Sequence, residues 1–385
     1  MARPFQPIWT AFPSRFAGLS KAASRGWLAV LALLMILAAS ALITPGPPPN
    51  VHTGLPTSDA ASGSAADDDR ADVMLYQQIA AGVRGGGNYY AVAAGSQRRM
   101  GYPLRPFVTM RLPTLALIQA FLPHLSVLIL LYGLAAATAL AWYFRLDAIL
   151  PRLTARAIGL VLLGCGSLIC LRADLAPFHE VWAGLLIALS LAMWRPDDWL
   201  PAVSAATCAM LIRETAALYA IVMAIMAWRA GNRREVAGWA MGLGILSIAV
   251  AAHIYGWSQV VRPADEPGPG WSGLLGFGFF AKTITLLTAL APLPELIGVL
   301  LVALALFGWA GLRDPLGTRA TAVLAAYAVL VSLFCRTDTY YWSLLVAPVS
   351  LIGLAFAPDA VRDLIGNLRD RRRIIVTRTA LGEGP

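Results

Sequence analysis

Long apolar segments separated by short polar ones follow one another along most of the chain. A membrane-spanning helix needs about 20 mostly apolar residues, and residues 27–44, WLAVLALLMILAASALIT, form the first run of this kind. The further apolar segments lie at 114–144, 157–172, 179–194, 199–212, 215–229, 236–256, 284–311, 319–335 and 341–357. The pattern predicts an all-α, polytopic membrane protein with about ten transmembrane helices.

The first apolar run has two interpretations. A basic start followed by an apolar run and small residues also fits a cleaved signal peptide. The run at 27–44 is long for a signal peptide, and many more apolar segments follow it. We therefore interpret it as an uncleaved first transmembrane helix.

The longest polar interruption, residues 45–113, comes directly after the first predicted span. It opens with PGPPPN and a stretch rich in Ser, Ala, Gly and Asp, which predicts a loop. Residues 72–83 then place four apolar side chains at helical spacing, namely Val73, Tyr76, Ala80 and Val83. This spacing predicts a short amphipathic helix at the membrane interface, ended by RGGGN. The following MGYPLRPFVTMRLPT mixes Arg, aromatic residues and Pro, which is typical of an interfacial loop or a re-entrant piece.

The composition agrees with a membrane protein. Hydrophobic residues make up 58% of the 385 residues and charged residues 13%, and the mean hydropathy is +0.67, whereas soluble proteins average about 25% charged residues. The net charge of +9 does not indicate a nucleic-acid partner. Its basic residues are dispersed between apolar segments, and are not gathered on one face of a soluble core.

The placement of arginines predicts an orientation in the membrane, with both termini in the cytoplasm. The basic tails are then residues 1–26 and 358–385, and residues 114–357 form a multi-helix domain with a second outer loop at 257–283. The first outer loop, at 45–113, is the main exception to the rule. It carries Arg98, Arg99, Arg105 and Arg111, which suggests that these outer arginines have another role.

Cofactor motifs are missing from the sequence. The four cysteines, Cys165, Cys170, Cys208 and Cys335, form no CxxC pair and do not cluster with His at zinc spacing. No P-loop, dinucleotide-binding glycine pattern or HExxH motif occurs in a supporting context. We expect no structural disulfide and no metal site, and no cofactor is required by the residues; a divalent metal would be compatible with them.

Four aspartates crowd together in DDDRADVMLY at residues 67–76: Asp67, Asp68, Asp69 and Asp72. Asp69 stands where an N-cap of the predicted helix belongs, and Asp72 lies three residues on, near the positive end of the helix dipole. Capping explains Asp72 less fully, because this residue lies closest to the apolar helix face. It also has a phenol, Tyr76, one helical turn away.

Further polar groups fall on the outer side in this orientation: His179, Glu180, Arg213, Glu214, Arg336, Asp338 and Tyr340. Each segment has a structural explanation. PFHEVW fits an interfacial helix start, LIRETAALY an interfacial turn, and the aromatic residues of RTDTYYW an aromatic belt. Charges near membrane depth are costly unless they are paired or line a wet cavity, so the alternative is a charged cavity wall. An arginine such as Arg336 would suit a lipid phosphate, which guanidinium binds bidentately.

Three segments carry a resemblance to a known superfamily. The helix-forming DVMLYQQIAAGVRGGGNYY, together with LIRETAALY and RTDTYYWSLLVAPVSLIGLAF, resembles segments of bacterial, mannosyltransferase-like members of the GT-C integral membrane glycosyltransferases. The resemblance covers about residues 25–360. The chain departs from oligosaccharyltransferases and classical protein mannosyltransferases, since it lacks a clear Asp-Glu pair in the first loop and a large soluble C-terminal domain.

The resemblance implies a protein of the bacterial inner membrane that transfers a hexose or pentose from a polyprenyl-phosphate donor to a lipid or glycan acceptor in the periplasm, with inversion of configuration. By position the catalytic Asp falls on Asp72, with Asp69 as the competitor. A carboxylate can act as the general base for the acceptor hydroxyl, and cations can stabilise the leaving phosphate. Arg336 is the first candidate for the phosphate, followed by Arg105, Arg111 or Arg213. The further candidates for substrate contact are Tyr76, His179, Glu180, Glu214, Asp338 and Tyr340.

Two other function classes stay open. A multi-span transporter or lipid flippase would share the predicted topology, but transporters often show internal repeats and helices broken in both halves. We find no convincing repeat, and the single long first loop disfavours that interpretation. The third class is a non-catalytic membrane scaffold, for which the charged outer cluster would need no purpose.

Overall fold

The computed structural model describes residues 7–47 and 71–369. Within these ranges the chain is helical, and it forms no strand apart from an isolated bridge between Arg105 and Pro267. The helices are α1 (Lys21–Ala39), η1 (Ser40–Ile43), α2 (Ala71–Arg84), α3 (Tyr89–Arg99), η3 (Phe107–Thr109), α4 (Thr114–Phe121), α5 (His124–Asp147), α6 (Leu153–Ser167), η4 (Ile169–Leu171), η5 (Ala173–Leu175), α7 (His179–Met193), α8 (Leu200–Ile212), η6 (Glu214–Ala216), α9 (Ala217–Arg229), α10 (Arg233–Ser258), α11 (Gly276–Leu286), α12 (Glu295–Gly311), α13 (Pro315–Phe334), η7 (Thr337–Leu345), α14 (Ala347–Ser350), η8 (Leu351–Ala355) and α15 (Ala357–Arg369). The all-α prediction is confirmed for this part of the chain.

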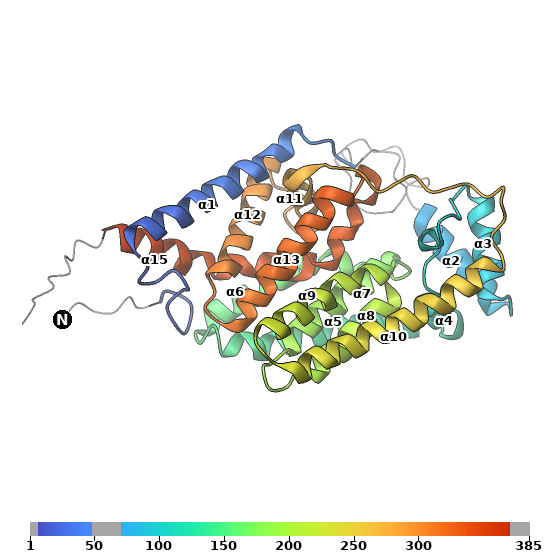
Figure 1. The fold of residues 1–385 in the computed structure, drawn as a ribbon, viewed down its shortest axis with the longest axis horizontal. Helices are drawn as coiled ribbons and strands as arrows, with labels where there is room; N and C mark the ends of the chain where they lie inside the picture. The colour runs from blue at the N-terminus through green and yellow to red at the C-terminus, as the bar shows by residue number, and fades with distance from the viewer. Residues whose placement is uncertain (1–6, 48–70, 370–385) are drawn as a thin grey trace, which may run out of the picture.

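Most of the longer helices form a bundle along the long axis of the molecule (Figure 1). At one end, here named the α15 end, lie α15 and the start of α1. At the other, named the α2 end, lie α2, α3 and α4. α10 joins the bundle to the α2 end, where Gly256 packs so closely on α3 that an added Cβ would lie 2.2 Å from Cε2 of Tyr90.

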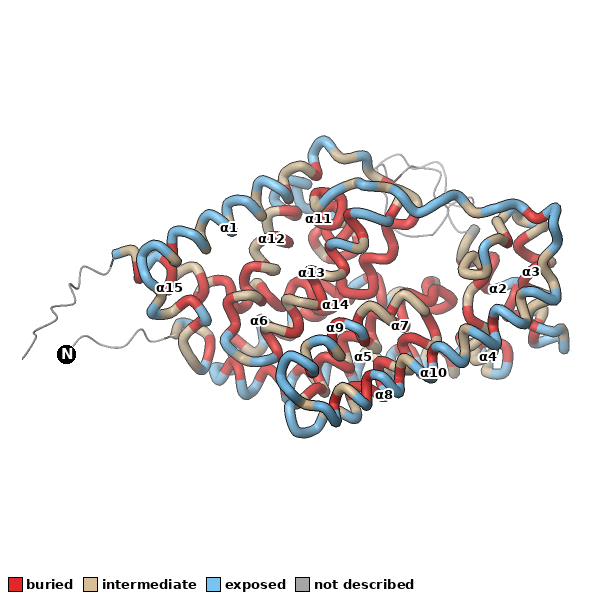
Figure 2. Tube along the Cα trace, in the orientation of Figure 1, coloured by how far each residue is buried: buried red, intermediate tan, exposed pale blue. Residues whose placement is uncertain are grey.

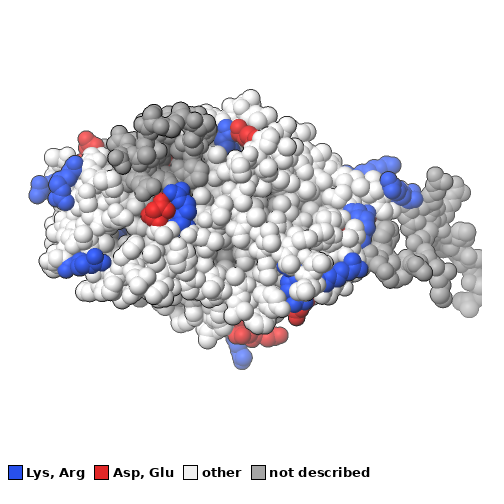
Figure 3. Space-filling view, turned by 180° about the vertical axis from the view of Figure 1, so that it is seen from behind, with Lys and Arg blue, Asp and Glu red and all other residues white. Residues whose placement is uncertain are grey.

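Four of the described helices are long and apolar enough to cross a membrane: α1 continued by η1, α5, α10 and α13. The first three turn most of their side chains outward, since only 11%, 22% and 28% of their most apolar windows are buried (Figure 2). Exposed apolar surface of this extent is unfavourable in water. On the face that Figure 3 shows, Lys, Arg, Asp and Glu are few and most of the surface is formed by other residues, as suits a protein in lipid.

Several shorter apolar helices accompany these four: α6, α7, α8, α12 and the segment Phe107–Phe121. α7 is the most enclosed of them, with nearly every side chain from His179 to Ala192 buried. The number of ten spans stays a prediction, as does the assignment of the segment after α1 to the periplasm.

Two spans that were predicted as continuous are broken by proline. The span predicted at 114–144 is divided into α4 and α5, and Pro123 occupies the N-cap position of α5. Proline has no N–H to donate, and its ring clashes with the preceding helical turn. The span predicted at 284–311 is likewise divided, because α11 ends at Leu286 and α12 begins after Pro294.

The span predicted at 341–357 is not a regular helix. Its residues belong to η7, α14 and η8, which are mostly 3-10 turns, and nearly all of their side chains are buried. Irregular backbone is tolerated at membrane depth only where protein surrounds it. Glycine permits this enclosure: an added Cβ on Gly308 of α12 would lie 1.9 Å from the carbonyl oxygen of Gly353.

The amphipathic helix expected at 72–83 is confirmed as α2. Val73, Tyr76, Ala80 and Val83 are all buried, as the helical spacing of apolar residues predicts. α2 packs against α3 and α4, and these three helices form the layer at the α2 end.

A strap, residues 259–275, connects α10 to α11 and corresponds to most of the outer loop predicted at 257–283 (Figure 1). Asp265 accepts hydrogen bonds from Nε and Nη2 of Arg98 on α3, at 2.7 and 2.8 Å. The Gly268 N–H donates to the carbonyl of Arg105 at 2.5 Å. The hydrogen bond from Arg98 lowers the pKa of Asp265 to about 2.

A helix that the sequence analysis did not predict, α15, opens the expected C-terminal tail. Its buried side chains recur at helical spacing, at Ala360, Asp363, Leu364 and Asn367. Asp359 holds the segment before α1, because its carboxylate accepts from the N–H groups of Ile8, Trp9 and Thr10 at 2.6, 3.0 and 3.0 Å. The two ends of the described chain are thus tied together at the α15 end.

The first prediction concerns this carboxylate. Asp359→Asn replaces a charged acceptor of three backbone N–H groups by an amide that can accept on one atom only. Hydrogen bonds to charged groups contribute about 1.5–3 kcal/mol each, so we expect the free energy of unfolding to fall by about 2–4 kcal/mol. Thermal unfolding in detergent measures this. The exposed Arg369→Gln on the same helix is the control, and equal stability of the Asp359 variant and the wild type would contradict the assignment.

The second prediction concerns the strap. The pKa of Asp265 is depressed in the folded state, so the ion pair stabilises the fold above the unfolded-state pKa of about 3.9. That stabilisation is lost as the pH falls through the folded-state value of about 2. We expect Asp265→Asn to unfold at a lower temperature than the wild type near neutral pH, and this difference to shrink as the pH falls below about 4.

Amide exchange of residues 262–268 should also be faster in the Asp265 variant at neutral pH. Glu266→Gln changes the neighbouring acid, whose side chain is exposed, and is the matched control. A stability difference that stays constant below pH 4 would show that the charge of Asp265 is not its cause.

Candidate functional site

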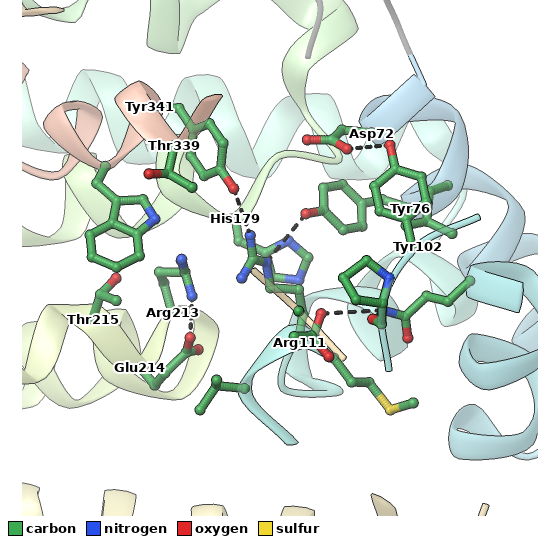
Figure 4. Close-up of a pocket in the computed structure, with 18 of the residues that line it drawn as sticks. Asp72, Tyr76, Tyr102, Arg111, His179, Arg213, Glu214, Thr215, Thr339 and Tyr341 are labelled. Carbon is green, nitrogen blue, oxygen red and sulfur yellow. Dashed lines mark hydrogen bonds and ion pairs between the residues drawn. The ribbon is translucent and has the colours of Figure 1, made fainter. Parts of the chain in front are cut away.

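A cavity of about 620 Å³ lies at the α2 end, between the α2–α4 layer and the bundle. Its wall is formed by α2, by the loop from Tyr102 to Arg111, by the start of α7, by the junction of α8 and α9, by the strap and by the start of η7. Figure 4 shows side chains from α2, from the loop before α4, from α7, from the junction of α8 and α9 and from η7 converging on one space. Most of the polar residues singled out in the sequence line it: Asp72, Tyr76, Arg111, His179, Arg213, Glu214, Arg336 and Asp338.

Asp72 lies in the first turn of α2 and reaches the cavity with a phenol beside it. The hydroxyl of Tyr102 donates a hydrogen bond to Asp72 Oδ1 (Figure 4). Burial and the adjacent Asp72 carboxylate raise the pKa of Tyr102, so this phenol stays protonated and can only orient the carboxylate as a donor. The interaction fixes one carboxylate oxygen of Asp72 in the cavity wall.

Arg111 enters the cavity from the loop before α4 and is held by phenols. Its Nε donates to the Tyr76 hydroxyl at 3.2 Å, and its Nη2 donates to the Tyr341 hydroxyl at 3.3 Å. Its backbone carbonyl accepts from the Tyr89 hydroxyl at 2.6 Å. The nearest carboxylate oxygen with which it forms an ion pair is Glu180 Oε1, 3.8 Å from Nη2, so Arg111 is oriented mainly by neutral partners.

Arg213 is the most enclosed cation of the site, with 1% of its surface exposed. α8 ends just before it, and its extended backbone turns the side chain toward α7. Its Nε donates to Glu180 Oε1 at 2.5 Å, and its Nη1 pairs with Glu214. The guanidinium carbon also lies 5.9 Å from the ring centroid of Trp342, a distance that permits a cation–π interaction.

Arg336 lies at the start of η7 and is fully engaged with its surroundings. Its Nε donates to Asp338 Oδ1 at 2.9 Å, and its Nη2 pairs with the other oxygen of the same carboxylate. Its Nη1 donates to the strap carbonyls of Pro269 and Gly270 at 3.0 and 3.1 Å. These contacts fasten the strap beside the cavity.

The remaining candidates from the sequence are placed less directly. Tyr340 is fully buried, and its neighbour Tyr341 lines the cavity. Arg105 does not line it, and Glu180 reaches it only through its pairs with Arg111 and Arg213. Asp69, the competitor of Asp72, lies outside the described residues.

The sequence analysis missed Tyr102 and Tyr341 as site residues. Aromatic residues are common at membrane interfaces, so neither position carries a signal in the sequence that separates it from an aromatic belt. The contact with Asp72 or Arg111 that distinguishes them depends on the fold.

Metal ligands are not gathered in the described ranges: no group of three or more His, Cys, Asp and Glu side chains there is arranged to hold an ion. The expectation that no metal is required stays a prediction, because the acidic cluster at residues 67–69 lies outside those ranges.

Comparisons with known proteins identify no relative. No protein-family model, no curated protein and no solved structure matches this chain. The function must therefore be inferred from the residues of the cavity and from their surroundings.

Proposed function

We propose that the protein is a GT-C-type glycosyltransferase of a bacterial inner membrane. It would transfer a sugar from a polyprenyl-phosphate donor to a lipid or glycan acceptor at the periplasmic face, with Asp72 as the general base. The observation that supports this most is the shared cavity. A carboxylate, Asp72, and two guanidinium groups, Arg111 and Arg213, line one space at one end of an apolar helical bundle.

The carboxylate suits the first half of the reaction. The hydroxyl oxygen of the acceptor attacks the anomeric carbon, and its proton passes to Asp72 as the new bond forms. The bond between the anomeric carbon and the phosphate oxygen breaks, and polyprenyl phosphate leaves. A single displacement of this kind, through an oxocarbenium-like transition state, inverts the configuration.

The arginines suit the second half, in which negative charge grows on the leaving phosphate. Arg336 is the weakest of the lining arginines for this role, since Asp338 and two strap carbonyls occupy its guanidinium. Arg213 is paired with two carboxylates. Arg111 is held mainly by phenols, which leaves its charge least compensated, and we rank it first.

In the proposed topology, the two ends of the bundle face opposite sides of the membrane. Several arginines lie at the α15 end, where Arg15 and Arg152 donate to the carbonyls of Leu312 and Ile8. That end is assigned to the cytoplasm by the positive-inside rule. The α2 end, with the cavity, is then periplasmic, which is the side where polyprenyl-phosphate sugars would be used.

A transporter or flippase is the alternative. Its path would have to continue from the cavity through the bundle, whose interior toward the α15 end holds large buried side chains. Trp142 and Trp309 are fully buried and pack edge-on with ring centroids 6.1 Å apart, and Phe356 packs on Trp309 in turn. This packing favours a site that opens at one end.

The third prediction tests the base. Asp72→Asn keeps the shape of the side chain but cannot accept the acceptor's proton, so the rate of sugar transfer should fall by about 10²- to 10⁴-fold. Transfer is measured with purified protein in lipid nanodiscs, using labelled polyprenyl-phosphate mannose and, in parallel, the glucose and arabinose donors. Asp69→Asn is the matched control and should keep its activity.

Normal transfer by both variants would overturn the mechanism. A loss confined to Asp69→Asn would move the base to Asp69. Uptake of a solute that survives both substitutions, without sugar transfer by the wild type, would support the transporter.

The fourth prediction tests the ranking of the arginines. Arg111→Lys keeps a positive charge but removes the planar donor pair, and kcat/KM should fall by about 10²- to 10³-fold. Arg336→Lys should lower kcat/KM by less than about tenfold, because its contacts are structural. Thermal unfolding of both variants separates a loss of fold from a loss of rate. The reverse order of effects at equal stability would restore Arg336 as the first phosphate ligand.

A further inference from the structure

The imidazole of His179 has no hydrogen-bond partner among the described residues, although it is buried. His179 is the first residue of α7, is 3% exposed, and lines the cavity. Neither Nδ1 nor Nε2 finds a partner in the described part of the chain. Leaving such groups unsatisfied costs free energy, and few are left so in folded proteins without water or a ligand to meet them.

The surroundings of His179 restrict where the missing partner can be. The ring packs edge-on against Tyr76 with centroids 4.8 Å apart, so one side of the imidazole is covered. The next residue, Glu180, is fully buried and bound to Arg213, which fixes the start of α7. Since the ring borders the cavity, the space available for a partner is the cavity itself.

His179 also occupies a central position. In Figure 4 it lies between Asp72, Tyr76 and Tyr102 on one side and Arg213 and Glu214 on the other. A molecule that extends from the Asp72 side of the cavity to the Arg213 side would therefore pass the imidazole.

The chemistry of the partner follows from the charge state of the ring. The guanidinium groups of Arg111 and Arg213 both lie near the His179 ring. Nearby cations disfavour a further positive charge on the imidazole. A neutral imidazole offers one donor and one acceptor. A phosphate oxygen can meet only the donor and an ammonium only the acceptor, whereas hydroxyl groups can meet both.

We infer that His179 binds a hydroxyl group of a sugar ring held in the cavity and takes part in selecting the substrate. The inference rests on the proposed glycosyltransferase function. The hydroxyl belongs either to the transferred sugar or to a glycan acceptor, and both present the same chemistry to the imidazole.

The experiment compares the wild type with His179→Leu, His179→Asn and His179→Gln in the transfer assay. Leucine removes both polar atoms, whereas the amide of asparagine approximates the position of Nδ1 and that of glutamine the position of Nε2. We expect His179→Leu to lower kcat/KM by about 10- to 100-fold. One of the two amide variants should keep kcat/KM close to that of the wild type. Rescue by one amide reports a polar contact that a packing role of the ring would not produce.

Deoxygenated substrates identify the hydroxyl and its source. One arm uses monodeoxy forms of the donor sugar that the wild type transfers, and the other uses monodeoxy acceptors. The wild type should transfer the analogue that lacks the recognised hydroxyl more slowly than the parent substrate. His179→Leu should transfer the two substrates equally, because the substitution and the deoxygenation remove the same contact. His253→Leu is the matched control, since His253 is also buried but its Nε2 donates to the Met110 carbonyl at 3.1 Å. It should leave the ratio between parent and deoxy substrates unchanged.

Each outcome decides the inference. Full activity and an unchanged substrate preference in His179→Leu, with an active wild type, would overturn it and leave the proposed function standing. A loss that neither amide rescues and that is equal for every deoxy substrate would assign His179 a structural role only. No transfer by the wild type would overturn the proposed function and this inference together.

Discussion

The buried guanidinium of Arg213 is the constraint around which the site is arranged. A charge that is 1% exposed in an apolar bundle is tolerated only with partners that compensate it. Those partners lie in the first turn of α7, at Glu180, and at the start of η6, at Glu214, so the pairing fixes where both elements meet. Glu180 also faces Arg111 of the loop before α4. Two parts of the bundle and the loop before α4 are thereby joined at one point, and the cavity wall follows from that junction.

The need to satisfy backbone groups in apolar surroundings shapes the rest of the wall. Helices that face outward, such as α1 and α10, are regular, whereas the irregular η7, α14 and η8 are enclosed by protein. That arrangement obeys the rule that broken helices at membrane depth must be shielded. It has a consequence for the site, since a regular helix could not present both Tyr341 and Trp342 to the cavity beside Arg336.

Hydrophobicity along the chain predicted where most helices lie, and the helical spacing of Val73 to Val83 predicted α2. It did not predict the breaks at Pro123 and Pro294, because an averaged apolar pattern does not change at a proline. The charged candidates could be recognised from the sequence because charges are rare in apolar segments. The ranking of the arginines as phosphate ligands could not be recognised from the sequence. Arg336 was predicted first, but the fold shows its guanidinium bound to Asp338 and to two strap carbonyls. Tyr102 gained significance only through its contact with Asp72.

The charged side chains of the cavity divide by the kind of partner that holds them. Arg213 and Arg336 are paired with carboxylates, and such pairs neutralise charge while they fix the geometry. Arg111 is instead oriented mainly by the phenols of Tyr76 and Tyr341, and its ion pair with Glu180 is longer, at 3.8 Å. A neutral phenol fixes the direction of a charged group without cancelling its charge. A guanidinium held mainly in this way keeps more of its charge for a ligand than one paired closely with a carboxylate, which is why Arg111 is ranked above Arg213 and Arg336 for the leaving phosphate.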